Sequence, residues 1–419
     1  LPKFRSKFRQ PSQPNRHAVP MPRKAYIVLI AGCLILILST GTRQSFGLFL
    51  TPVSSGLGLD FQIFSLSIAI QNLVIGLSQP FVAAYADRFG TARVMATCGA
   101  LYVLGMITLA NAGGPMGLHL GAGLIVGLAA SGAGFTLVLG AVGRVVSEEK
   151  RSFALGIVAA FGSFGQMLAA PLNQQLISAF DVWTTFLILA AALGLIVPLA
   201  MALRGRAADT HDPRTEGQTL RQALDEALRH RSYVLLVIGF YVCGFQVQFV
   251  GVHLPNFLAT EGIPELAGIA IGIIGFFNFF GTLFFGWLGG RYPKNAVLSV
   301  LYFTRSVVFA LFMVFPVNSV SIILFAAAIG FLWLGTVPLT TGLVASMFGA
   351  RYLTTLASIT FLGHQLGSFT GSWVGGIMFD ATGSYDLMWI AVIGAGLFAA
   401  AVHLPISGKQ VGEAKTATA

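Results

Sequence analysis

The sequence predicts an all-α integral membrane protein with twelve membrane-crossing helices. Of its 419 residues, 55% are hydrophobic and only 10% are charged. A soluble domain carries about a quarter charged residues, so this chain has too few to cover a surface that faces water. The alternating apolar and polar strands that a membrane barrel needs are not evident. The composition therefore argues against a soluble enzyme, a disordered chain and a coiled coil.

A membrane-crossing helix needs about 20 mostly apolar residues. Stretches of that kind recur along the whole chain. The twelve expected spans are 25–50, 62–85, 93–112, 117–143, 153–178, 183–203, 232–257, 266–289, 295–315, 319–347, 354–379 and 387–406. An even number of spans places both ends of the chain on the same side of the membrane.

The basic residues indicate which side that is. Of the 25 Lys and Arg residues, 23 fall in the two tails or in connections that follow even-numbered spans. The opposite loops contain no Lys or Arg, and their acids are Asp60, Asp181, Glu261, Glu265, Asp380 and Asp386. Cytoplasmic loops are rich in Lys and Arg, so we expect an inner (plasma) membrane protein with both termini in the cytoplasm. The net charge of +10 therefore indicates membrane orientation and contact with lipid, with no nucleic-acid partner.

Two six-helix halves and a linker are the expected organisation. The chain begins with Leu1, and Met21 is a plausible natural start, so the polar stretch before it is expected to be a disordered tail. Leu220, Leu224 and Leu228 fall on one face of a short helix expected in the linker. The expected segments are an N-terminal tail at 1–24, a first half at 25–203, a linker at 204–231, a second half at 232–406 and a C-terminal tail at 407–419.

Internal repetition supports the two halves. Ala83–Gly90 after the second span corresponds to Gly286–Pro293 after the eighth, and the first and seventh spans end with Pro52 and Pro255 at the same offset. Weak matches that recur in order at a nearly constant offset indicate a duplicated unit. The sequence therefore predicts two pseudo-symmetric six-helix bundles.

Twelve spans in two related halves, with Asp-Arg-Phe-Gly after the second, resemble the major facilitator superfamily. The family motif in that loop resembles Gly-x-Leu-x-Asp-Arg-x-Gly-x-x-Arg, and this chain keeps the two charged residues, the second glycine and the last arginine. The resemblance implies a cytoplasmic gate whose charged loop binds helix ends of the other half. The residues assigned to it are Asp87, Arg88, Arg93, Arg144 and, in the degraded second copy, Arg291.

Arg43 is the leading candidate for contact with substrate. A charged side chain inside the bilayer is costly and usually functional, and Arg43 shares a helix face with Ser39, Thr40 and small residues. Its guanidinium can hold a carboxylate through two parallel hydrogen bonds. Gln246 is its repeat equivalent, so we expect the two side chains to face each other across the pseudo-twofold axis. Arg305 in the ninth span is expected to have an internal partner instead.

Further candidates lie in the second half. His364 and Gln365 sit near mid-depth in the eleventh span, beside a ladder of glycines four residues apart from Gly363 to Gly375 that would let helices approach closely. Asn278 and Trp333 complete the expected substrate site. Because no Asp or Glu falls inside a span, His253 and His364 are the candidates for a proton site.

Within the superfamily the chain resembles the bacterial monocarboxylate and oxalate–formate branch, through Thr42–Phe49, His253-Leu254-Pro255 and His364–Gly367. The resemblance implies a secondary active transporter that moves a small organic anion by alternating access and works as a monomer, and it leaves proton coupling open. The chain departs from this branch in two places. Its eighth span lacks the arginine of those relatives, and it carries His364 where oxalate exchangers have a lysine.

Other functions stay open at this point. An exporter of drugs or other hydrophobic compounds would share the fold, and a non-transporting sensor would need an additional signalling domain. An enzyme is not expected, because no nucleophile–base pair stands out. No cofactor or metal is expected either: the three cysteines lie in apolar runs and no nucleotide-binding loop of the Gly-x-x-x-x-Gly-Lys type occurs.

Overall fold

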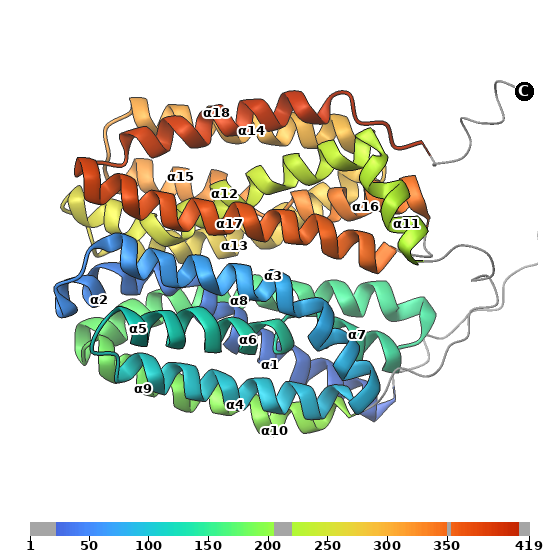
Figure 1. Ribbon diagram of the computed structural model, residues 1–419, viewed down its shortest axis with the longest axis horizontal. Helices are drawn as coiled ribbons and strands as arrows, with labels where there is room; N and C mark the ends of the chain where they lie inside the picture. The colour runs from blue at the N-terminus through green and yellow to red at the C-terminus, as the bar shows by residue number, and fades with distance from the viewer. Residues whose placement is uncertain (1–21, 205–219, 350–352, 410–419) are drawn as a thin grey trace, which may run out of the picture.

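A computed structural model describes residues 22–204, 220–349 and 353–409 of the chain. The expected tail before Pro22, residues 205–219 of the expected linker and the end of the C-terminal tail lie outside the described residues. Within the described part, helices form two bundles that lie one beside the other, with the first half in blue to green and the second in yellow to red (Figure 1).

The first bundle contains the first six expected spans. Three of them are interrupted helices, and the other three are single helices. The elements are α1 (Arg23–Gln44), η1 (Phe46–Phe49), α2 (Leu50–Leu57), α3 (Phe61–Phe89), α4 (Thr91–Ala110), α5 (Pro115–Leu118), η2 (His119–Ile125), α6 (Val126–Gly132), α7 (Phe135–Val145), α8 (Glu148–Ala179), α9 (Val182–Gly194), α10 (Ile196–Ala200) and η3 (Met201–Leu203).

The second bundle repeats this plan and is preceded by the short helix expected in the linker. Its tenth span is divided between two helices. The elements are α11 (Leu220–Arg229), α12 (Arg231–Thr260), α13 (Leu266–Gly289), α14 (Lys294–Val314), α15 (Ser319–Phe331), α16 (Thr336–Phe348), α17 (Leu353–Thr382) and α18 (Asp386–His403).

Eleven helical segments of the described chain are long and apolar enough to cross a membrane. They coincide with eleven of the twelve expected spans. The twelfth is α17, which is long enough but carries His364, Gln365 and many glycines and hydroxyl residues. It packs between α12 and α3, so its polar residues face protein, where they cost less than in lipid.

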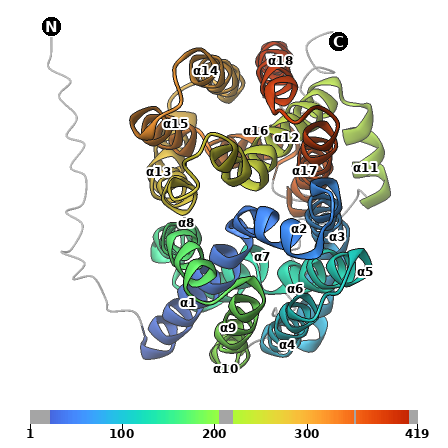
Figure 2. The ribbon, with the colours of Figure 1, turned by 90° about the vertical axis from the view of Figure 1, so that its left-hand side faces the viewer.

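The two bundles meet mainly along four pairs of elements. α3 packs against α17, α8 packs against α13, and η1 and α2 pack against α12. Figure 2, a view along the helices, shows α3 beside α17 and α8 beside α13 where the bundles join. Residues near the middle of these helices are therefore placed where both halves can contact one ligand.

The glycine ladder of α17 brings this helix into direct backbone contact with α12. A Cβ atom at Gly367 would collide with the carbonyl oxygen of Tyr241, and one at Gly371 would collide with that of Phe245. The close approach that the ladder predicted is therefore present within the second bundle. It fixes α17 against α12 and leaves the opposite side of α17 to contact α3.

The two ends of the molecule differ in charge. We call the end at which α1 begins and α18 finishes the basic end, because Lys24, Arg144, Arg204 and Arg291 lie there. We call the other end the acidic end, because it carries Asp60, Asp181, Glu261, Asp380 and Asp386. The described residues thus have the charge asymmetry expected from the sequence.

Candidate substrate site and gates

Arg43 lies near the end of α1, and its side chain is only partly buried. Its Nη1 donates a hydrogen bond of 3.4 Å to Oδ1 of Asn72 on α3. This is the one hydrogen bond that its guanidinium makes among the described residues. A guanidinium has five N–H donors, so most of the donors of Arg43 remain available to a ligand.

Asn72 connects Arg43 to the second bundle. Its own amide nitrogen is fixed by the carbonyl of Ile68, at 2.9 Å. Nε2 of Gln365 on α17 donates to the Asn72 carbonyl at 3.1 Å and also approaches Oδ1 at 3.5 Å. Sequence reasoning did not single out Asn72, although two adjacent amides, Gln71 and Asn72, in the middle of an apolar span were the available signal.

His364 continues the network on α17. Its Nδ1 lies 3.1 Å from Oε1 of Gln365, and because that oxygen is only an acceptor, Nδ1 carries the proton of this hydrogen bond. The rings of Phe240 and Phe361 pack on the imidazole. The thiol of Cys243 interacts with the ring as well. Apart from this contact, the buried Nε2 has no hydrogen-bond partner among the described residues.

We call Arg43, Asn72, Gln365 and His364 the central network. It brings three sequence-predicted site residues together at mid-depth and crosses from the first bundle to the second. Neutral and cationic donors converge there without a carboxylate among its members. An arrangement of this kind can bind an anion and can accept a proton.

Gln246 does not face Arg43, which corrects the expectation of a pair across the pseudo-twofold axis. Its side chain is fully buried, and its Nε2 donates to the carbonyl of Val392 on α18 at 2.7 Å. Its Oε1 accepts from Nη1 of Arg305 at 3.2 Å. Gln246 pairs with Arg305 of the ninth span because a buried guanidinium needs hydrogen-bond acceptors.

Arg305 on α14 has the internal partners expected for it. It is 1% exposed, and besides Gln246 it contacts the thiol of Cys243 at 3.6 Å. Its Nη2 donates to the carbonyls of Leu332 and Trp333. These carbonyls lie in the break between α15 and α16, where regular helix bonding is interrupted. Arg305 therefore supplies donors that the broken tenth span lacks.

Trp333 lies in the same break, and Asn278 contacts it. Trp333 is buried and its indole Nε1 has no partner among the described residues. Asn278 on α13 accepts from the backbone nitrogen of Leu334 at 3.1 Å and donates to Oγ of Ser163 on α8 at 3.0 Å. Asn278 thus joins the bundles at their second interface, a role that its position in the sequence alone did not reveal.

His253 is a fully buried residue on α12 with a partner for each ring nitrogen. Nε2 lies 2.7 Å from the carbonyl of Ser372 and therefore donates to it, whereas Nδ1 lies 3.1 Å from the hydroxyl of Tyr385. The same hydroxyl accepts from Asn256, at 2.8 Å. Asn256 in turn accepts from the Thr51 hydroxyl of the first bundle at 2.8 Å. These contacts place His253 in a structural chain near the acidic end, away from the central network.

Asp380 forms a second contact between the bundles at the acidic end. The carboxylate lies at the end of α17, and its two oxygens accept from the backbone nitrogens of Phe61 and Gln62 at 3.0 and 2.8 Å. These nitrogens open α3, where the helix dipole favours negative charge. Sequence reasoning noted Asp380 only as a loop acid, because nothing in the sequence shows that it reaches a helix of the other half.

The expected gate residues lie at the basic end. Arg144 donates to Oγ1 of Thr91 at 2.5 Å and is attracted by Asp87. Arg88 lies over the ring of Phe89, and Arg291 lies over that of Trp287. Arg93 is exposed.

These contacts stay within one bundle each. The contact between Arg144 and the motif loop is of the kind expected, but a contact of the loop with the other half is not seen among the described residues.

Known proteins resemble the chain over nearly its whole length. The uncharacterized MFS-type transporter YcxA of Bacillus subtilis is 23% identical over 93% of this chain and 97% of its own length. Monocarboxylate transporter 13 of Rattus norvegicus is 25% identical over 89% of this chain and 86% of its own. The oxalate:formate antiporter of Oxalobacter formigenes is 22% identical over 78% of each chain.

The architecture of the two bundles also occurs in solved structures. The crystal structure of a mutant of the nucleoside transporter NupG aligns with a TM-score of 0.72 and 16% identity, and the alignment covers 91% of this chain and 99% of that one. Residues 32–372 match the Major Facilitator Superfamily. The family match covers about four-fifths of the chain, and the fold agrees with it. This chain therefore belongs to the Major Facilitator Superfamily of membrane transporters.

Proposed function

We propose that the protein is a secondary active transporter that moves a small organic anion, of the monocarboxylate class, across the membrane. The observation that carries this proposal is the state of Arg43. Its guanidinium lies in the first membrane-crossing segment, is only partly buried, and uses one long hydrogen bond to Asn72. A carboxylate that accepted two hydrogen bonds from the free donors would neutralise a charge that no acid of the central network neutralises.

Gln365 and His364 support the same site from the second bundle. The hydrogen bonds from Gln365 to Asn72 hold the two bundles together around Arg43. A proton taken up at Nε2 of His364 would add positive charge beside the anion without breaking the bond at Nδ1. His364 is therefore the proposed proton carrier, and His253 is not, because both of its nitrogens are already engaged.

Alternating access is the proposed mechanism. The contacts of Asp380 with α3 and of Thr51 with Asn256 would close the acidic end. We assign the acidic end to the outside and the basic end to the cytoplasm, because loops rich in Lys and Arg stay on the cytoplasmic side. In the opposite state the Asp87 and Arg144 region would close the basic end, with Arg88, Arg93 and Arg291 contributing charge, and the acidic end would open.

The named relatives agree with a small carboxylate as substrate. Two of the similar proteins are named for monocarboxylates and for oxalate and formate. A carboxylate is what those ligands share, and it is the group that a guanidinium recognises. The replacement of the exchanger's lysine by His364 favours a monocarboxylate over a dianion.

Uptake into proteoliposomes tests the proposal. Wild-type protein should accumulate labelled pyruvate or lactate when the outside is acidic, and Arg43→Gln should reduce uptake at least tenfold, because one charge-assisted hydrogen bond contributes about 1.5–3 kcal/mol. Arg229→Gln, which removes an exposed charge from α11, is the matched control and should transport normally. Full uptake by a correctly folded Arg43→Gln protein would refute the assignment.

His364→Gln tests the coupling separately. This variant should still exchange internal for external carboxylate, because the anion site is intact, but a pH gradient should no longer drive accumulation. Extrusion of a cationic dye by the wild type, with no carboxylate uptake, would instead support the alternative of an exporter of hydrophobic compounds.

A further inference from the structure

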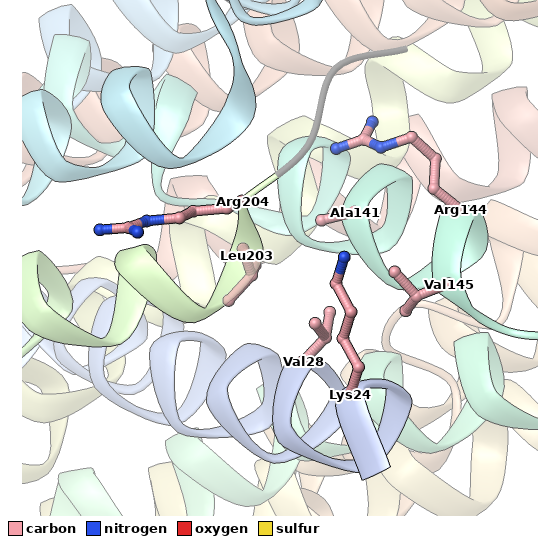
Figure 3. Close-up of a pocket in the computed structure, with 7 residues that line it drawn as sticks. All are labelled: Lys24, Val28, Ala141, Arg144, Val145, Leu203 and Arg204. Atoms are coloured by element: carbon pink, nitrogen blue, oxygen red, sulfur yellow. The ribbon is translucent and has the colours of Figure 1, made fainter. Parts of the chain in front are cut away.

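A pocket of about 190 Å³ opens at the basic end of the first bundle, away from the central network. Liquid water occupies about 30 Å³ per molecule, so this space exceeds what a single bound water would need. Its walls come from the first turns of α1, the last turns of α7 and the end of η3. Figure 3 shows Lys24 rising from α1 toward Ala141, with Arg144 and Arg204 at other sides of the pocket.

The lining combines cations with apolar groups. Three of the seven lining residues are basic (Lys24, Arg144 and Arg204), and the other four are apolar, Val28 and Leu203 among them. No acid is among the lining residues. Asp87 in the last turn of α3 attracts Arg144, whereas Lys24 and Arg204 have no carboxylate partner among the described residues.

The start of α1 adds to the positive potential. The N-terminus of a helix carries a partial positive charge, which acidic residues in the first turn usually compensate. The first turn of α1 contains no acid, and Arg23 and Lys24 occupy it instead. A bound anion would relieve the repulsion among these charges.

Exposed apolar side chains lie close in the chain to two of the lining bases. Ile27 and Ile30 follow Lys24 on α1 and are 48% and 56% exposed, and Met201 precedes Arg204 at the end of the sixth span and is 47% exposed. Basic and apolar side chains thus occupy the same ends of two membrane-crossing segments, where the headgroup and acyl chains of a phospholipid meet.

We propose that this pocket binds the phosphate of an anionic phospholipid from the leaflet at the basic end. Lys24, Arg144 and Arg204 hold the phosphate, and the acyl chains lie along Ile27, Ile30 and Met201. Arg144 also binds Thr91, the first residue of α4, so an occupied pocket tethers the start of that helix to the lipid. The inference does not depend on which anion the central network transports.

Lipid binding to the purified full-length protein tests the proposal. In nanodiscs that contain phosphatidylglycerol in a phosphatidylcholine background, wild-type protein should retain phosphatidylglycerol through extraction, as read by native mass spectrometry. Each basic residue near an anionic surface contributes about fivefold in affinity. The Lys24→Gln/Arg204→Gln variant should therefore retain it about 25-fold more weakly.

Two controls make the result specific. The Arg229→Gln/Lys409→Gln variant removes two exposed charges of the basic end outside the pocket and should retain lipid as the wild type does. Melting in pure phosphatidylcholine should be the same for all three proteins, because Lys24 and Arg204 are exposed. Equal loss in both double variants, or no loss in either, would overturn the proposal.

A third arm distinguishes lipid from a soluble anion. Inorganic phosphate and glycerol phosphate, added to protein in phosphatidylcholine nanodiscs, should raise the melting temperature far less than phosphatidylglycerol does. Stabilisation by either soluble anion that matched phosphatidylglycerol and disappeared in the Lys24→Gln/Arg204→Gln variant would overturn a lipid as the ligand.

Discussion

Two polar networks inside the helical bundles each contain one arginine. Arg305 is buried, and its two terminal nitrogens donate to Gln246, Cys243 and two backbone carbonyls, all within the second bundle. Arg43 is partly buried and has one long hydrogen bond, in a network that continues into the other bundle. The same residue type therefore serves structure in one place and, on our proposal, ligand binding in the other.

On this proposal, the partners of a guanidinium distinguish a structural cation from one that binds a ligand. The acceptors of Arg305 include carbonyls exposed by the break between α15 and α16, so the cation and the broken helix satisfy each other. Arg43 has no such set among the described residues. The predictions below test this contrast, beginning with the largest expected effect.

Replacing each arginine by methionine should separate stability from transport. Arg305→Met leaves the carbonyls of Leu332 and Trp333 and Oε1 of Gln246 without their donor, and an unsatisfied buried acceptor costs about 1–3 kcal/mol. We expect a loss of about 3–5 kcal/mol and a clearly lower melting temperature in detergent. Arg43→Met should change the free energy of unfolding by no more than about 1 kcal/mol. Equal destabilisation by both substitutions would contradict the contrast.

The two glutamines form a second matched pair. Gln246→Leu removes an acceptor of Arg305 and should destabilise the protein by about 1–3 kcal/mol, with transport per folded molecule retained. Gln365→Leu removes the link to Asn72 and should lower transport about two- to tenfold with a smaller effect on melting. The check is uptake normalised to folded protein. Normal uptake by Gln365→Leu would show that Gln365 does not contribute to the substrate site.

Asp380 extends the comparison to the contact between the bundles at the acidic end. Asp380→Asn weakens the cap on α3, an interaction of about 0.5–2 kcal/mol, so the population with an open acidic end should increase about fivefold. Spin labels at Ser55→Cys and Glu261→Cys report the separation of the bundles there, since both positions are exposed. An unchanged distance distribution would mean that this contact does not hold the end closed.

Asp181 caps α9 within a single bundle and should give the smallest effect. The backbone amide and the hydroxyl of Thr184 hold the pKa of Asp181 below its usual value of about 3.9. A depressed pKa contributes stability above the unfolded-state pKa, and this contribution is lost as the pH falls through the folded-state pKa. As the pH falls below about 4, the melting temperature of the wild type should therefore decrease more than that of Asp181→Asn. Spin-label distances should be the same in both proteins.

Much of the fold could be predicted from the sequence. Runs of apolar residues predicted all twelve spans, including α17, although it falls outside the eleven most apolar segments of the described chain. The close packing of α17 on α12 followed from the glycine spacing, because a glycine every fourth residue forms a continuous groove on one helix face. These features depend on local composition and period, which can be read directly from the chain.

The site was predicted less completely, because hydrogen-bond partners depend on three-dimensional neighbours. Arg43, His364 and Gln365 were found because polar groups in an apolar span are conspicuous. Asn72 and Asp380 were missed as connections, since their partners lie about 290 and 320 residues away in the chain. Gln246 was assigned by repeat symmetry, which does not reveal that its side chain accepts a hydrogen bond from Arg305.

Direct binding to purified protein tests the central claim, that Arg43 is the anion-binding cation. Labelled pyruvate should bind the wild type and, more weakly, Arg43→Lys, which keeps the charge but loses the forked donors. Arg43→Gln should bind at least tenfold more weakly at an unchanged melting temperature. Wild-type affinity in a folded Arg43→Gln protein would contradict the account.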